Sequence, residues 1–228
     1  MKKLLEVTFQ ALKEATKTGL KDSIIPDRMR KALEDDLFIF SGCKTEAQLR
    51  EAAKLLRDAD GKVKPFYKFK EDIQAIHKNY NEAYLQAEYN YATSTAQAAA
   101  KWAKYAEDGN EFDLQYRTAQ DDRVRESHSR LHNVTLPFNS PFWDKYFAPN
   151  GWRCRCQVVQ VRKGKFDLSD ERIALKEGEA ATTYLNPKGV NTLEIFRYNA
   201  GKQEVIFPPN HPYYQSKEQV TNIISPPQ

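Results

Sequence analysis

The chain has 228 residues, with 40% hydrophobic and 29% charged residues, which is enough for a well-packed core. Its 12 tyrosines and 12 phenylalanines argue against a disordered chain, and no apolar run approaches the roughly 20 residues that span a bilayer. The polar start predicts no secretory signal, and three cysteines (Cys43, Cys154 and Cys156) are too few for a disulfide framework. A reducing cytoplasm, or a particle assembled there, fits these features.

The N-terminal part of the chain reads as helical. An amphipathic pattern starts at Met1 and stops at Gly19, a residue type that often follows the end of a helix. A capping-box pattern at Thr45 and Gln48 predicts another helix start. The expected elements are helices over 1–18, 26–34 and 45–56, an extended segment or turn at 37–40, and a break at 58–61.

The longest expected helix begins after Pro65 and ends near Gly109. Apolar and aromatic residues recur along it at a spacing of seven, as in Ile73, Tyr80 and Ala87, and in Tyr84, Tyr91, Ala98 and Tyr105. About 40 residues would give a helix of about 60 Å. Such a stripe either packs on the chain's own helices or forms a surface that docks on another chain, and both interpretations stay open.

After Gly109 the pattern changes to short segments separated by Gly, Pro and Asn. The expected elements are strands over 112–118 and 155–161, helices over 127–132 and 169–178, a hairpin of 193–198 with 204–207, and a surface or mobile tail over 208–228. The sequence therefore predicts an α+β protein in which an N-terminal helical region with one long helix precedes a small loop-rich β-containing module. We divide it into a helical arm over 1–110, a module over 111–165 and a C-terminal region over 166–228.

Charge is unevenly spread along the chain. The segment 115–165 carries ten basic and four acidic residues, a net charge of +6, against +4 for the whole chain. A basic segment of this kind can attract phosphate groups or an acidic protein surface. It can equally be a solvated face with internal ion pairs.

Four residues of this segment are candidate metal ligands: His128, His132, Cys154 and Cys156. Histidines four apart share one helix face, and cysteines two apart share one strand face, so a tetrahedral zinc site could form where the faces meet. His211 is a possible substitute ligand. The alternative is a pair of small buried cysteines beside a histidine that is hydrogen-bonded to a carboxylate such as Asp122.

Catalytic motifs are hard to find. The sequence has no Walker loop, no G-x-G-x-x-G and no H-E-x-x-H. A Cys154/His128 dyad lacks a loop that would present the nucleophile, and a metal-dependent nuclease would have to use Asp121, Asp122 and His128. We therefore do not expect an enzyme.

A series of short motifs in register carries the most specific information. In order they are Tyr116-Arg117-Thr118-Ala119, Asp122-Arg123-Val124-Arg125, His128 with Leu131, Pro141-Phe142-Trp143, Pro149-Asn150-Gly151-Trp152 and Cys154-Arg155-Cys156. Their order and spacing resemble the phage Mu F-like, or phage head-morphogenesis, family. Where that family usually has Gly after the position of His132, this chain has Asn133, a residue type that tolerates the left-handed backbone. His132 is not a fixed feature of the family pattern, which leaves His128, Cys154 and Cys156 as the better ligands.

The resemblance implies a minor capsid protein of a tailed double-stranded DNA phage or prophage, acting in head assembly near the portal. Its implied partners are portal and capsid or scaffold proteins, with packaged DNA as an open possibility and no membrane. Its implied location is the capsid interior, after assembly in the host cytoplasm. The alternatives are a zinc-stabilised DNA-binding protein of the head interior and a metal-dependent hydrolase. The residues that would form the structural signature of the fold are Asp122, Arg123, Arg125, Trp143, Gly151 and Trp152.

Overall fold

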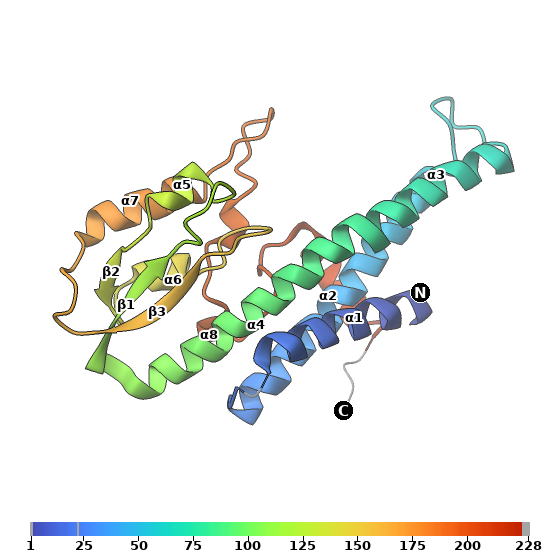
Figure 1. Ribbon diagram of the computed structural model, residues 1–228. Coiled ribbons are helices and arrows are strands. Elements are labelled where there is room, and N and C mark those ends of the chain that lie inside the picture. The colour runs from blue at the N-terminus through green and yellow to red at the C-terminus, as the bar shows by residue number, and fades with distance from the viewer. Residues whose placement is uncertain (1, 22, 225–228) are drawn as a thin grey trace.

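The computed structural model describes residues 2–21 and 23–224. Long helices lie at one end of the molecule and a small sheet with short helices at the other, and the long helix runs from the first group to the second (Figure 1). The helices of the first group are α1 (Lys2–Leu20), α2 (Asp27–Lys54), α3 (Phe66–Lys78) and α4 (Leu85–Asp108). The predicted α+β class is confirmed.

Helix α1 forms as predicted, but Gly19 has a different role from the expected one. The helix includes Gly19 and ends at Leu20, and Lys21 takes the left-handed backbone with φ +43°. A Cβ at Gly19 would lie 2.2 Å from the backbone oxygen of Thr93 in α4. Glycine is therefore needed here because α1 and α4 approach closely.

Helix α2 corrects the prediction of two short helices with an extended segment between them. Residues 37–40 are helical, and Thr45 lies inside the helix, so it does not cap one. The apolar run is buried because α2 crosses the core, where Phe40 stacks on Phe207 with ring centroids 3.6 Å apart. Burial on nearly all sides hides the helical period in such a run.

The long helix extends from Phe66 to Asp108, as predicted, with one π-helical stretch, η1 (Asn79–Tyr84), between α3 and α4. Gly109, with φ +58°, follows its last residue. Along its length the helix contributes to two separate cores. Tyr91 and Ala96 belong to the core between the helices, whereas Ala98 and Tyr105 pack against the sheet. The helix therefore links the two parts of the molecule.

The sheet consists of β1 (Phe112–Arg117), β2 (Thr135–Pro137) and β3 (Gln157–Arg162), all antiparallel, in the order β2-β1-β3. Short helices α5 (Glu126–Ser129), α6 (Phe142–Tyr146) and α7 (Glu171–Ala181) gather around it (Figure 1). Both strands predicted from the sequence are present, although β3 begins two residues later than expected. Leu114, Tyr116 and Trp143 are fully buried between the sheet and these helices.

The predicted hairpin over 193–207 is wrong. This segment instead contains the short helices η3 (Glu194–Phe196) and α8 (Ala200–Gln203), and Asn199 caps α8 by accepting a hydrogen bond from the Lys202 amide. A Cβ at Gly201 would lie 2.4 Å from the Cβ of Trp102, so α8 packs tightly on α4. The Asn-Ala-Gly sequence therefore begins a helix and does not form a hairpin turn.

The expectation of a loose tail after residue 208 is wrong for the part that the structure describes, and residues 225–228 lie outside it. Helices η4 (Pro212–Ser216) and α9 (Lys217–Thr221) pack on α2. The Asp36 carboxylate in α2 accepts hydrogen bonds from the amides of Ile206 and Phe207 and from the Tyr214 hydroxyl. These contacts attach the C-terminal segment to the N-terminal helices.

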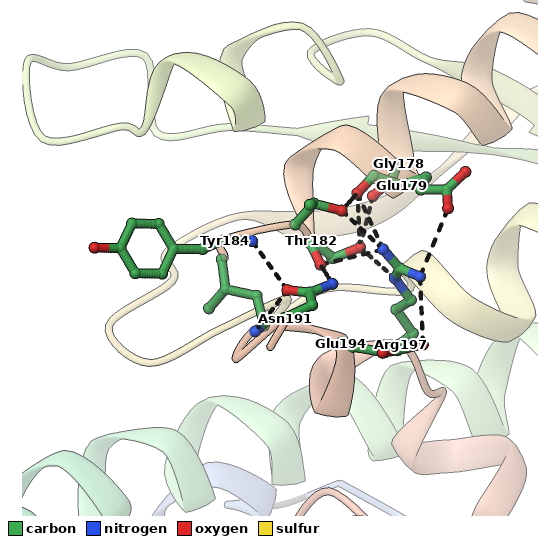
Figure 2. A network of polar contacts seen from close by, with 9 residues as sticks. Gly178, Glu179, Thr182, Tyr184, Asn191, Glu194 and Arg197 are labelled. Carbon is green, nitrogen blue, oxygen red and sulfur yellow. Dashed lines mark hydrogen bonds and ion pairs between the residues drawn. The ribbon is translucent and has the colours of Figure 1, made fainter. Parts of the chain in front are cut away.

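A polar network holds the loop that follows α7 (Figure 2). The Arg197 guanidinium donates to the Thr182 hydroxyl at 2.8 Å and to carbonyl oxygens at the end of α7. Asn191 donates to the Thr182 carbonyl and accepts from the Tyr184 amide. The network fixes the path of residues 182–197 against the sheet module. None of the described helices has the length and apolarity needed to cross a membrane.

Candidate metal centre

His128 and the two cysteines come from two separate segments. His128 lies in the single-turn helix α5, whereas Cys154 and Cys156 belong to the loop that leads into β3. A tight turn presents the cysteines, because Gly151 has φ +142°, Arg153 has φ +59°, and the Cys154 amide donates to the Gly151 carbonyl. We predicted the cysteines on a strand, but β3 begins only at Gln157.

The three side chains nevertheless meet. The Nδ1 atom of His128 lies 3.7 Å from Cys154 Sγ and 3.6 Å from Cys156 Sγ, and their potential ligand atoms lie within 4.8 Å of one another. His128 is 1% exposed, Cys154 is 8% exposed and Cys156 is half-buried. The structure therefore brings these three side chains together.

The surroundings favour a thiolate at this site. A hydrogen bond from Cys156 lowers the pKa of Cys154 well below its ordinary value despite burial, and His128 lowers that pKa further. The hydrogen bond to Cys154 and burial together raise the pKa of Cys156. Burial and both cysteines raise the pKa of the nearby Tyr116 hydroxyl. Because thiolates bind metals and thiols do not, Cys154 is the sulfur that is prepared to be a ligand.

Arginines surround the cysteines in a cleft of ≈ 360 Å³, lined by Arg123, Val124, Arg125, His128, Arg153, Cys154, Arg155 and Cys156. Three of these guanidinium groups have partners, and the first of them, Arg123, pairs with Asp121 at 3.7 Å. Arg155 forms two hydrogen bonds with Asp121, and Arg125 donates to the Trp152 carbonyl at 2.6 Å. Arg153 is exposed and forms no ion pair with any described residue. We call this feature the arginine cleft.

The two proposed substitute ligands lie elsewhere. Helix α5 ends at Ser129, so His132 does not share a helix face with His128, and its Nδ1 instead bonds to the amide and hydroxyl of Thr118. His211 is buried next to Phe40 and Trp152, where its Nδ1 accepts a hydrogen bond from the Tyr213 amide. Neither belongs to the cluster of His128, Cys154 and Cys156.

Asp122 does not contact His128, and the neighbouring Asp121 forms the ion pair of this turn. Asp122 is exposed and has no hydrogen bond or ion pair with the described residues, and Nε2 of His128 has no partner, so the alternative of an Asp122–His128 hydrogen bond is wrong. Asp121 pairs with Arg155 and accepts from the Arg123 amide, and Arg155 holds the pKa of Asp121 at about 2. The Asp-x-Arg turn could have indicated Asp121, since aspartates often accept from the amide two residues on.

The other signature residues shape the loop or fill the core. A Cβ at Gly151 would lie 3.1 Å from the Arg125 guanidinium, so glycine lets that side chain reach the loop. Trp152 packs against Tyr91 and Phe196, with ring centroids 4.9 and 5.3 Å away. Trp143 is fully buried. Asn133 has φ +67°, which confirms that it takes the left-handed backbone of the turn.

The buried His211 should make stability fall in weak acid. Burial lowers the pKa of His211 from 6.5 to about 4, so the folded state holds the ring neutral while the unfolded chain protonates it. The contribution of the neutral His211 ring to the free energy of unfolding is fully present above pH 6.5. It is lost as the pH falls to about 4, a change of about 3 kcal/mol. The variant His211→Asn can still cap η4 but does not titrate. In urea unfolding, its free energy of unfolding should therefore fall less between pH 6.5 and 4 than that of the wild type. Equal losses would contradict the assignment.

Two phage-derived proteins resemble this chain. The "Putative capsid assembly protein F" of Escherichia phage Mu is 38% identical over 116 residues, which cover 48% of this chain and 25% of that protein. The "Mu-like prophage FluMu F protein" of Haemophilus influenzae is 34% identical over 91 residues, which cover 36% of this chain and 22% of that protein. The matched region therefore spans about a quarter of these relatives. No solved structure matches the chain.

The model for the family "Phage Mu protein F like protein" matches residues 45–159, which is half of the chain, so the chain belongs to this family. The matched range includes the last third of α2, the whole long helix, and the cluster of His128, Cys154 and Cys156. The resemblance inferred from the motifs is confirmed.

Proposed function

We propose that this chain is a minor head protein of a tailed double-stranded DNA phage or prophage, and that it acts in head assembly next to the portal. The observation that carries the proposal is the family match over the long helix and the sheet module, together with a relative named as a capsid assembly protein. The protein would act in the host cytoplasm during assembly and remain in the head of the virion. Its partners would be the portal and capsid or scaffold proteins.

The attachment surface in this proposal is the tip of the α2–α3 hairpin, residues 55–70, which protrudes from the molecule (Figure 1). Leu56, Val63, Phe66 and Tyr67 expose 43%, 62%, 77% and 61% of their surface there. The tip also carries five basic and two acidic side chains. Apolar residues surrounded by positive charge suit a partner surface that is apolar in its centre and acidic at its rim.

Hydrogen bonds within the tip hold its backbone in one conformation. Arg57 pairs with Val63 across the turn and donates to the Gly61 carbonyl at 2.7 Å, and the Asp58 carboxylate accepts from the Asp60 and Lys62 amides. A preformed surface binds with a smaller loss of conformational entropy than a mobile loop. This order supports a docking role for the exposed residues.

The double variant Phe66→Ser/Tyr67→Ser should fold normally but fail to enter phage heads. Its free energy of unfolding should change by less than about 1 kcal/mol, because both side chains are exposed. The measurement is the amount of the protein in purified heads after complementation of a phage that lacks it. The matched control is Tyr184→Ser/Leu185→Ser, which alters two equally exposed side chains in the loop after α7 and should be incorporated normally. Normal incorporation of the tip variant would refute the docking surface.

Proximity to the portal needs its own measurement. A photo-crosslinking residue in place of Tyr67 should capture the portal protein in assembling heads, and the same residue in place of Tyr184 should not. Capture of the major capsid protein alone would place the chain away from the portal, while leaving its role in head assembly intact.

A further inference from the structure

His128, Cys154 and Cys156 are the one group of potential metal ligands that meets in the described part of the chain. All three side chains are held by short-range backbone structure, with His128 in α5 and the cysteines in the turn before β3. Imidazole and thiolate are ligands that zinc prefers over hard cations. Hard cations such as Mg²⁺ would require oxygen ligands, and none joins this group.

The distances match a tetrahedral ion. With Zn–S bonds of about 2.3 Å and Zn–N bonds of about 2.0 Å, a tetrahedral angle separates a sulfur from a nitrogen by about 3.5 Å. The observed separations from His128 Nδ1 are 3.7 Å to Cys154 and 3.6 Å to Cys156. Both sulfur–nitrogen separations are therefore within about 0.2 Å of the tetrahedral value, and two thiolates would balance the charge of the ion.

The fourth ligand position is open to the arginine cleft. The nearby carboxylates do not supply it, because Asp121 is paired with Arg155 and neither Asp121 nor Asp122 joins the ligand group. The cleft instead presents guanidinium groups, which attract anions and bind phosphate oxygens. A neutral zinc–dithiolate–imidazole unit beside several positive charges favours an anionic fourth ligand over a further histidine or cysteine.

We propose that Zn²⁺ binds to His128 Nδ1, Cys154 Sγ and Cys156 Sγ, and that its fourth position holds a water that a phosphate group from the arginine cleft can replace. The ion would join α5 to the 151–156 turn and so stabilise the module. Zinc sites with three protein ligands and one exchangeable position differ in this respect from closed structural sites with four. The proposal does not depend on a role in head assembly.

The metal content of the purified protein tests whether the three residues bind zinc. The tag-free full chain, refolded with Zn²⁺ and dialysed, should contain about one zinc per chain by elemental analysis. Cys156→Ser and His128→Asn should each lose most of it, whereas Cys43→Ser, which removes a buried cysteine in the helical core, should keep it. Wild-type protein that takes up no zinc, or a Cys156→Ser variant that binds as much as the wild type, would overturn the proposal.

The reactivity of the cysteines in the wild type tests the site even if the variants do not fold. In the native wild type, zinc should protect Cys154 and Cys156 from a thiol reagent, and a chelator should expose both to it. Cys43 is buried and should not respond to the chelator in either state. Equal reactivity of the two cysteines with and without the chelator would also overturn the site.

Cobalt tests the open position. Co²⁺ in place of zinc should give the absorption bands of a tetrahedral thiolate site, and inorganic phosphate at constant ionic strength should shift them with saturation. Arg153→Gln should weaken the apparent phosphate affinity by about tenfold, the loss of one charge-assisted hydrogen bond, and the control Arg172→Gln on α7 should not change it. Bands that do not respond to phosphate would show a closed site. If free phosphate binds, competition by a short DNA duplex would show whether DNA phosphates reach the same position.

Discussion

Replacing Glu88 by Gln should lower the free energy of unfolding by about 3–5 kcal/mol, because it leaves the ammonium group of Lys44 buried without a counter-charge. The Lys44 side chain is 1% exposed and that of Glu88 is 4% exposed, and the two form an ion pair between α2 and α4. Burial lowers the pKa of Lys44 and raises that of Glu88, and the ion pair between them opposes both shifts. Chemical denaturation of the single variant measures the cost.

The double variant Lys44→Met/Glu88→Leu should recover most of this loss, since it removes both charges and keeps the volume. The pair Lys13–Glu34 is the matched control. It joins α1 to α2 at 2.5 Å, but its side chains are 44% and 35% exposed. Glu34→Gln should therefore cost less than about 1 kcal/mol. Equal costs at Glu34 and Glu88, or a double variant as unstable as Glu88→Gln, would contradict the assignment of the effect to burial of the charge.

The buried ion pair also marks a limit of sequence-based prediction. Lys44 follows a short apolar run and Glu88 lies within the aromatic stripe, but nothing in either neighbourhood indicates that the two meet. A charged residue in an amphipathic helix normally faces solvent. Only the crossing of α2 and α4, which depends on the whole fold, places both side chains in the core.

The features that the sequence did predict depend on local patterns. The long helix follows from a spacing of seven over several turns, and the strands at 112 and 157 follow from alternation. The three candidate ligands were selected by residue type and spacing, and the family motif favoured His128 over His132. In each case the relevant residues are near one another in the chain or belong to a motif of fixed spacing.

The errors come from contacts between distant segments. Residues 37–40 were expected to be extended, but they are helical because they pack against the C-terminal segment, where Phe40 meets Phe207. The C-terminal region was expected to be a hairpin and a loose tail, whereas the amides of Ile206 and Phe207 bond to Asp36, 170 and 171 residues earlier. Single-turn helices gain most of their stability from such contacts, which no local pattern records.

Trp143→Ala should lower the free energy of unfolding by about 3–5 kcal/mol, because it removes the largest fully buried side chain of the sheet module. The indole packs edge-on against Phe142 and Phe147, and its Nε1 donates to the Pro137 carbonyl at 3.0 Å. The Trp143 carbonyl also accepts from Asn199, so the site connects the module to α8. Urea unfolding of the purified variant measures the loss.

A graded series separates packing from hydrogen bonding at this position. Trp143→Phe keeps an aromatic ring but removes the indole donor to the Pro137 carbonyl, which then accepts from the Ser140 amide alone. Its cost should therefore lie between those of the wild type and the alanine variant. Trp152→Ala is the informative comparison, because Trp152 is only half-buried and packs on the helical core. If Trp143→Ala kept its stability but was lost from phage heads, the residue would be a contact surface and not part of the folding core. The complete burial of its ring argues for the core, since a side chain with no exposed surface cannot touch a partner unless the module opens.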